Sequence, residues 1–198
     1  MISIRTTGIE QRAATIVAKA KNPRAVLLGM GREGANVLKN HFRQKDRTDI
    51  NRLNPNRREH YWLGVSRGVQ SPVVPTPTRV EIDINHPSIA QKVFGGPIVA
   101  KRVRNLSIPE SPEAYGRTPA TFERETGLKL VVLKTGPKQT LVLAALRGAG
   151  QFEIEYLLTP RVNQKPDPTA LPDEGKFADA VIERGQKVLD RQNAEENQ

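Results

Sequence analysis

The chain has 198 residues and a formal net charge of +10, with 37% hydrophobic and 5% aromatic residues. This length is enough for a domain with a hydrophobic core of modest size. The chain contains no cysteine, which excludes disulfides, thiolate metal ligands and cysteine nucleophiles. No apolar run approaches the roughly 18 residues of a membrane span, and residues 1–5 lack the apolar core of a signal peptide. The sequence therefore predicts a protein that is made in a cytoplasm and does not associate with membranes.

The positive charge is unevenly distributed. Residues 1–58 hold 13 Lys and Arg against 4 Asp and Glu (+9), residues 59–150 hold 12 against 7 (+5), and residues 151–198 hold 6 against 10 (−4). A basic front indicates contact with nucleic acid. It is equally consistent with contact to the acidic end of an identical neighbour, as in the head-to-tail interfaces that build rings. Composition alone does not choose between these interpretations.

The first part of the chain is predicted to be mainly helical. A short strand over residues 2–6 precedes a helical pattern over residues 9–20, and Asn22-Pro23 should end that helix because proline lacks a backbone donor. A second helical pattern places apolar residues on one face between residues 27 and 42. Residues 43–59 are polar, basic and rich in Asn, which predicts a long loop.

The middle of the chain is predicted to contain short strands between loops. Alternating apolar residues begin a strand region at 61–65, and prolines interrupt the loop that follows over residues 68–79. Residues 80–84 alternate apolar and acidic side chains, as a half-buried antiparallel strand does. A short helix over residues 87–94 should end at two glycines. The polar stretch 109–127 predicts a second long loop.

The last part of the chain predicts a meander, an arm and a helix. Three closely spaced strands, over residues 128–134, 139–147 and 152–158, are joined by glycine-containing turns. Prolines at 160, 166, 168 and 172 predict an extended arm before the final helix. The fold class is therefore α+β, with N-terminal helices packed on an antiparallel sheet. We expect one core over residues 1–159, and a Pro-rich arm with the C-terminal helix over residues 160–198.

The glycine run Gly29-Met30-Gly31-Arg32-Glu33-Gly34 matches the dinucleotide-binding pattern G-x-G-x-x-G. Such a site needs a helix N-terminus at the glycines and a second parallel strand that ends at an acidic residue. Residues 43–59 before and after Asp49 do not supply that strand. We therefore interpret the glycines as points of close helix packing, and no cofactor is predicted.

No catalytic or metal pattern emerges from the remaining polar residues. The three histidines, His41, His60 and His86, have no metal-ligand spacing and are interpreted as ordinary surface or capping residues. The carboxylate pairs Glu81/Asp83 and Glu153/Glu155 each share one face of a predicted strand. Alternation with apolar residues indicates that this face is solvated, which argues against paired-carboxylate catalysis. The sequence therefore predicts no enzymatic activity.

Two basic clusters are the candidate contact residues. They could follow a phosphate backbone, with the aromatic residues at 61 and 62 available for stacking. The alternative is a solvated loop that meets an acidic neighbour. No helix-turn-helix, zinc-binding or RNA-recognition pattern accompanies them. The first cluster comprises Arg43, Lys45, Arg47, Arg52, Arg57 and Arg58, and the second comprises Lys101, Arg102 and Arg104.

Several segments together resemble a known family. The most specific is His86-Pro87-Ser88-Ile89-Ala90-Gln91-Lys92-Val93-Phe94-Gly95-Gly96-Pro97-Ile98. The others are residues 2–4, 22–28, 40–43, 100–101, 106–109, 114–119, 156–160, 164–168 and 171–172. With these segments the chain resembles the phage virion morphogenesis proteins, the tail-completion or tail-terminator group of Mu-like and related tailed phages.

The resemblance implies a structural role in finishing the tail or joining it to the head, as one subunit of a ring in the virion. Its implied partners are copies of itself and adjacent tail-tube, neck or head-completion proteins. The +9 charge of residues 1–58 separately predicts weak, non-specific contact with packaged DNA. The apolar face of the last helix is expected either to pack on the chain's own core or to reach a neighbour through the arm. Two alternative functions stay open, namely a basic DNA-binding protein without enzymatic activity and a nucleotide-binding enzyme.

Overall fold

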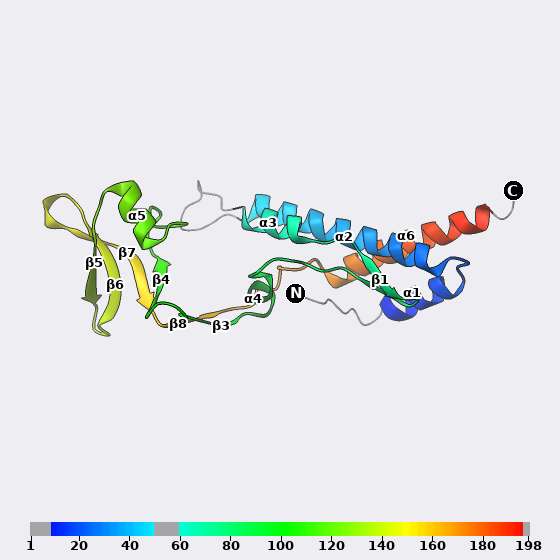
Figure 1. Ribbon diagram of the computed structural model, residues 1–198, viewed down its shortest axis with the longest axis horizontal. Coiled ribbons are helices and arrows are strands. Elements are labelled where there is room, and N and C mark those ends of the chain that lie inside the picture. The colour runs from blue at the N-terminus through cyan, green and yellow to red at the C-terminus, as the bar shows by residue number, and fades with distance from the viewer. Residues whose placement is uncertain (1–8, 50–59, 196–198) are drawn as a thin grey trace. The chain divides into compact units, whose positions relative to one another are not determined.

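The computed structural model describes residues 9–49 and 60–195 and confirms an α+β fold (Figure 1). The described residues form two compact units. Unit 1 comprises residues 9–49, 60–95 and 166–195, and unit 2 comprises residues 96–165. This division differs from the single core expected over residues 1–159. The reason is that the C-terminal helix packs within unit 1, whereas residues 96–165 bury a core of their own.

Three helices build one core of unit 1: α1 (Ile9–Ala18), α2 (Pro23–Thr48) and α6 (Glu174–Ala194). The Asn22 side chain caps α2 by accepting a hydrogen bond from the Ala25 N–H at 3.1 Å, and Pro23 takes the first helical position. This confirms the predicted break between the first two helices. Val26, Leu27 and Met30 of α2 pack against Val181, Ile182 and Leu189 of α6 in one buried cluster. The apolar face of the C-terminal helix is thus buried on its own chain.

The glycine run lies inside α2 rather than at a helix N-terminus. A Cβ atom on Gly29 would lie 2.8 Å from Val188 of α6, and one on Gly34 would lie 2.8 Å from Ile82. A Cβ atom on Gly31 would lie 2.5 Å from Val80 and 2.6 Å from Pro72. The structure therefore confirms that these glycines are points of close packing, where neighbouring side chains approach the backbone of α2.

A second core of unit 1 forms around α3 (Tyr61–Gly68), which replaces the strand predicted over residues 61–65. Trp62, Val65, Ser66 and Val69 are buried and follow helical spacing, whereas Tyr61 and Leu63 are only half-buried. The strand prediction was wrong because it took Tyr61 and Leu63 as the inward-facing residues. Both are only half-buried, and Trp62 between them is the buried residue. The unit is completed by the hairpin β1 (Val73–Thr76) and β2 (Arg79–Glu81) and by α4 (Ile89–Phe94), which ends at Gly95 with a φ of 66°.

Unit 2 contains a four-stranded antiparallel sheet in the order β4-β7-β6-β5. Its strands are β4 (Leu106–Pro109), β5 (Leu130–Thr135), β6 (Thr140–Leu146) and β7 (Phe152–Thr159), with the short 3-10 helix η1 (Gly148–Gly150) between the last two. The predicted meander is confirmed. The helix α5 (Pro119–Thr126) lies within the stretch predicted as loop 109–127, because Thr118 caps it and Gly127 ends it with a φ of 74°.

The Pro-rich arm is partly a strand. β8 (Arg161–Gln164) pairs antiparallel with β3 (Gly96–Val99), and both belong to unit 2. The remainder of the arm, from Pro166, belongs to unit 1 and leads into the Asp173 cap of α6. Residues 161–164 of the arm contain no proline, so all four keep the backbone N–H groups that donate hydrogen bonds between strands.

We predict that Gly31→Ala lowers the melting temperature. Overpacking against the rigid ring of Pro72 costs about 1–3 kcal/mol, which exceeds the gain of about 0.5–1 kcal/mol from replacing a mid-helix glycine. Gly175→Ala is the matched control, because its Cβ would meet nothing closer than 3.4 Å. Thermal unfolding followed by circular dichroism measures both variants. Equal melting temperatures for the two would contradict this packing account.

Candidate functional site

One face of the sheet in unit 2 is apolar and is not covered by any helix among the described residues of this unit. Leu130, Leu143, Ala145 and Tyr156 point toward α5 and share a buried cluster with Phe122. Because side chains alternate along a strand, the intervening residues lie on the opposite face, which we call the open face. Its members, paired by register, are Leu106, Ile108, Val131, Leu133, Val142, Ala144, Leu146, Phe152, Ile154 and Leu157.

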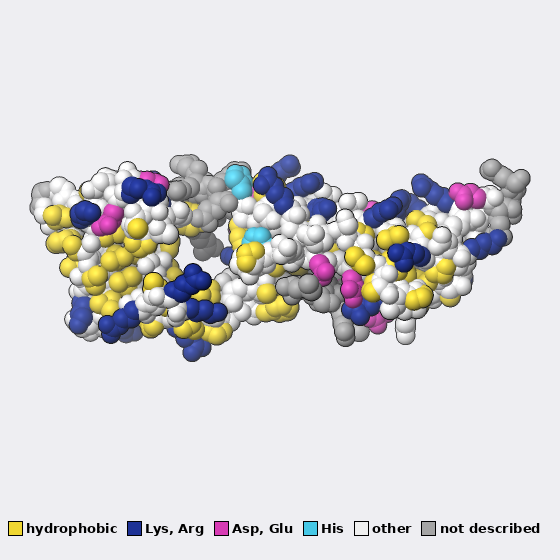
Figure 2. All heavy atoms as spheres, viewed as in Figure 1, with side chains coloured by type: hydrophobic (Ala, Val, Ile, Leu, Met, Phe, Trp, Pro, Cys, Tyr) yellow, Lys and Arg dark blue, Asp and Glu magenta, His cyan; other side chains and the backbone are white. Residues whose placement is uncertain are grey.

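Exposure of the open face is highest at the end where β6 turns into β7, and lowest at its centre. Val142 and Ala144 on β6 are buried, but Leu146 is 50% exposed, Phe152 is 52% exposed and Ile154 is 39% exposed. The remaining positions on this face of the strands are threonines, so the face carries no charged side chain. Figure 2 shows hydrophobic side chains gathered over the sheet of this unit. Exposed apolar patches of more than a few hundred Å² are typical of interaction sites.

A bulge in β7 turns Glu155 into the interior. The register shifts between Leu143 and Ala144, which pair with Tyr156 and Ile154, so Glu155 is the extra residue. Its side chain is fully buried, whereas sequence alternation had predicted a solvated carboxylate. Arg147 donates to Glu155 at 2.6 Å and to Glu113 at 2.6 Å, and the Ser111 hydroxyl donates to the other Glu155 oxygen.

This network fixes the segment before α5 onto the sheet. The Arg147 Nε atom lies 2.9 Å from Glu153, and the Ala114 N–H donates to Ser111 Oγ at 3.0 Å. Hydrogen bonds from Arg147 to Glu113 and Glu155 hold the pKa of the guanidinium above its ordinary value despite some desolvation. With every carboxylate already paired to Arg147 or Ser111, the arrangement is explained by structural anchoring.

We predict that Arg147→Met destabilises the protein by about 3 kcal/mol, because it leaves the buried Glu155 carboxylate without its cation. Arg124→Met is the control, since Arg124 is exposed on α5 and should tolerate the change. Urea unfolding measures both. The double variant Arg147→Met/Glu155→Leu should recover part of the loss, and no recovery would argue against an uncompensated buried charge as the cause.

The predicted basic clusters are placed differently from each other. Arg43, Lys45 and Arg47 lie on α2, which extends to Thr48, so the loop predicted over residues 43–59 does not begin at 43. Arg52, Arg57 and Arg58 lie outside the described residues. Lys101, Arg102 and Arg104 lie in the loop between β3 and β4, where all three are exposed.

Lys45 is not available to a partner. Its ammonium group lies 3.1 Å from Asp167, 2.5 Å from the Thr169 hydroxyl and 4.8 Å from the centre of the Trp62 ring, and its side chain is 13% exposed. The neighbouring His41 contacts the Thr169 carbonyl oxygen through Nε2 at 3.1 Å. Together these contacts attach residues 167–169 to α2, so Lys45 and His41 serve the fold of unit 1.

Burial lowers the pKa of His41 below its ordinary value, because desolvation outweighs the hydrogen bond to Thr169 and Lys45 adds a like charge. We therefore predict that stability contributed by neutral His41 is present above about pH 6.5, the ordinary value, and is lost as the pH falls. Urea unfolding at pH 7.5 and 5.5 should show a larger loss for the wild type than for His41→Gln. Equal losses would contradict this assignment.

Sequence reasoning missed two members of a basic surface on α2. Arg32, Lys39, Arg43 and Arg47 lie within an arc of about 80° at 100° per residue, and we call this set the basic stripe. Arg32, Arg43 and Arg47 are exposed and Lys39 is half-buried. Arg32 and Lys39 lie within the helix predicted up to residue 42. Extending that helix to residue 47 would have placed them on one face with Arg43 and Arg47. Lys and Arg side chains follow the region of α2 in Figure 2.

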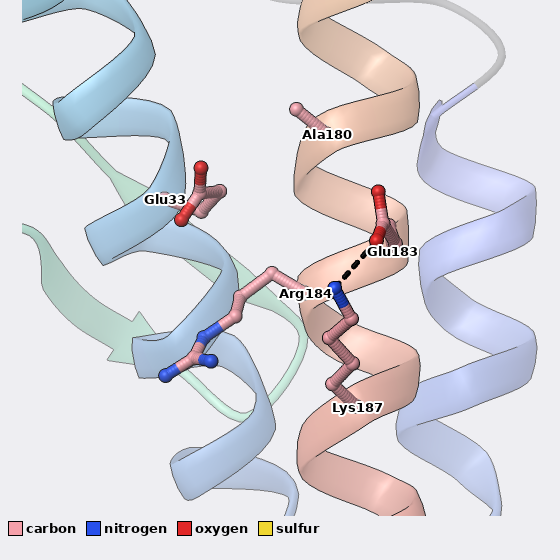
Figure 3. A pocket seen from close by; sticks show the side chains of 5 residues that line it. All are labelled: Glu33, Ala180, Glu183, Arg184 and Lys187. Atoms are coloured by element: carbon pink, nitrogen blue, oxygen red, sulfur yellow. Dashed lines mark hydrogen bonds and ion pairs between the residues drawn. The ribbon is translucent and has the colours of Figure 1, made fainter.

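A shallow depression lies between α2 and α6, with a volume of about 150 Å³ (Figure 3). It is lined by Glu33 of α2 and by Ala180, Glu183, Arg184 and Lys187 of α6. The Lys187 ammonium donates to Glu183 at 2.5 Å, and this hydrogen bond lowers the pKa of the Glu183 carboxyl. The charged side chains that line the depression are those of an ordinary helix surface, where opposite charges one turn apart pair with each other. They give no indication of a ligand.

Within residues 9–49 and 60–195, no group of three or more His, Asp or Glu side chains is placed to hold a metal ion. Across the same residues, no helix combines the length and apolarity that a membrane span requires. Comparisons of the chain with protein-family models, curated proteins and solved structures find no match. The resemblance to phage tail-completion proteins therefore stays a prediction from the sequence.

Proposed function

We propose that the protein is a structural virion subunit of a tailed phage, which assembles with copies of itself into a ring at the tail end or the head–tail junction. In this role it completes the tail, joins it to the capsid, or does both, and it has no enzymatic activity. Its further partners are the adjacent tail-tube, neck or head-completion proteins. It is assembled in the host cytoplasm and resides in the tail or neck of the virion.

The open face of unit 2 is the observation that supports this proposal. An antiparallel sheet with apolar residues on both faces is stable when both faces are covered, and in the described part of unit 2 a helix, α5, covers one of them. Four strands about 4.8 Å apart, with roughly six residues of 3.4 Å each, present a surface of roughly 400 Å². Two such surfaces together bury about 800 Å², less than the roughly 1,200 Å² at the lower end of stable specific interfaces, so the face suits one contact among several in an assembly.

A second copy is the occupant that fits this face. No side chain of the open face is charged, so an identical chain meets no like-charge repulsion there. Sheets pack face to face at about 10 Å when their apolar side chains interdigitate. Whether such contacts close into a ring depends on the rotation between neighbours, and closure is the part of the proposal that the sequence resemblance supports.

The two alternative functions fare differently. A nucleotide-binding enzyme would need the glycine run at a helix N-terminus, but the run lies inside α2 and packs against side chains. A DNA-binding role is favoured by the exposed stripe on α2 and by the loop at 101–104. Contact with DNA is compatible with the assembly role, and the two are separable by experiment.

We predict that Val131→Glu abolishes self-association and that Val132→Glu does not. The two residues are adjacent on β5, but Val131 lies on the open face and Val132 lies on the face that carries Leu130. They are 39% and 60% exposed, so neither change buries a charge within the chain. Sedimentation velocity gives the mass of each variant, and class averages of negatively stained particles show whether rings form.

The wild type is expected at a multiple of its 22.0 kDa chain mass, with Val132→Glu alike and Val131→Glu near the monomer. Circular dichroism should show the same fold for all three. A wild-type protein that stays monomeric at high concentration would contradict the proposed function. Assembly that both variants retain would contradict the open face as the contact.

A further inference from the structure

We infer that the basic stripe on α2 binds the phosphate backbone of double-stranded DNA without reading its sequence. This inference does not rest on the proposed assembly, because the stripe belongs to unit 1 and the open face belongs to unit 2. From Arg32 to Arg47 the helix rises about 22 Å, at 1.5 Å per residue. That length spans roughly six phosphates of one strand, which are spaced about 3.4 Å apart.

The four cations of the stripe make no ion pair within the described residues, whereas some other cations of unit 1 do. Lys45 pairs with Asp167, Arg12 pairs with Asp179 and Lys187 pairs with Glu183. Lys39 and Arg43, like Arg43 and Arg47, are four residues apart on one helix face, where like charges cost roughly 0.2–0.5 kcal/mol per pair. A polyanion lying along the stripe removes this repulsion and contributes attraction at each position.

Most acidic residues of the C-terminal helix are poor candidates for this partner in a second copy, Glu174 and Glu195 at its two ends being the exceptions. Asp179 and Glu183 are already paired within the chain, at 3.0 Å and 2.5 Å. Asp173 accepts the Lys176 N–H as the cap of α6, and Asp190 accepts from Gln186 at 2.7 Å. An external polyanion therefore fits better than the acidic end of a neighbour.

The side chains of the stripe suit phosphate groups. Guanidinium groups bind phosphate oxygens through two parallel hydrogen bonds, and three of the four cations are arginine. Asn36 and Asn40 lie on the same exposed part of α2 and add neutral donors, which commonly contact phosphates. The helices α3 and α6 pack beside α2 within unit 1. We therefore expect α2 to contact the phosphate backbone of DNA along its length without entering a groove of the duplex.

Binding of the full chain to two fluorescent 20-base-pair duplexes of unrelated sequence tests this inference. Four phosphate contacts predict that wild-type affinity falls roughly 10²-fold between 50 and 200 mM salt. The variant R32Q/K39Q/R43Q/R47Q should lose at least tenfold in affinity at 50 mM salt and most of its salt dependence. The control R124Q/K129Q/K134Q/K138Q makes the same change in net charge on exposed residues of unit 2, and it should bind like the wild type.

A third variant, R32K/R43K/R47K, keeps the charge and should retain most of the binding, which guards against a fold defect in the stripe variant. Equal losses in the stripe variant and the control would overturn the inference, as would a wild type that does not bind. Preference for one duplex above tenfold would overturn sequence independence. Displacement of the duplex by polyglutamate at equal charge concentration would assign the stripe to an acidic protein surface instead.

Discussion

A sheet with apolar residues on both faces must have both faces covered, and this constraint governs unit 2. On the α5 side the requirement is met by Phe122, which lies edge-to-face with Tyr156 at 6.0 Å between ring centres. Among the described residues of the unit, no helix covers the open face, and Leu146, Phe152 and Ile154 on it are exposed. Arg147 and its three paired carboxylates, including Glu155 at the bulge, lie off the open face, which carries no charge. The sheet is thus built with one side for folding and one side for association.

Unit 1 depends on a different constraint, the close approach of neighbours to α2. Small residues at 29, 31 and 34 let Val188, Val80 and Phe177 pack against the helix backbone from two directions. The packing at residues 31 and 34 occupies one side of α2, and the basic stripe lies on the solvent-exposed side away from it. Lys45 lies on the buried side of α2, where it contacts Asp167 and Trp62. The distribution of free and paired cations follows from which side of one helix is buried.

Much of the fold could be predicted from the sequence where local patterns and tertiary packing agree. The helices beginning near residue 9 and at Pro23, the three-stranded meander and the glycine packing all follow from spacing and turn residues. The failures have specific causes. At residues 61–65 apolar side chains recur with a period of two, as in a strand, but Tyr61 and Leu63 are half-buried residues of a helix. The helix α5 was hidden among prolines and glycines that in fact mark its two ends. Glu155 was misjudged because a bulge, which changes which face a residue takes, leaves no mark in the alternation of a single strand.

The candidate surfaces were predictable only in part, for a related reason. Charge clusters are visible in a sequence, but pairing is not. Arg43 and Lys45 are two residues apart, and only the second meets an acid, which comes from residue 167. The division into two units was likewise hidden, because residues 166–195 return to the first unit after 70 residues of the second.

The accessibility of Val131 tests the central claim most directly, that the open face is covered by another copy of the chain. Because the chain has no cysteine, Val131→Cys introduces a single thiol at a position that is 39% exposed within the chain. Its rate of reaction with a water-soluble thiol reagent can be followed as protein concentration rises. The account predicts fast reaction in dilute protein and strong protection once the chains associate. A rate independent of concentration, whether fast or slow, would contradict it.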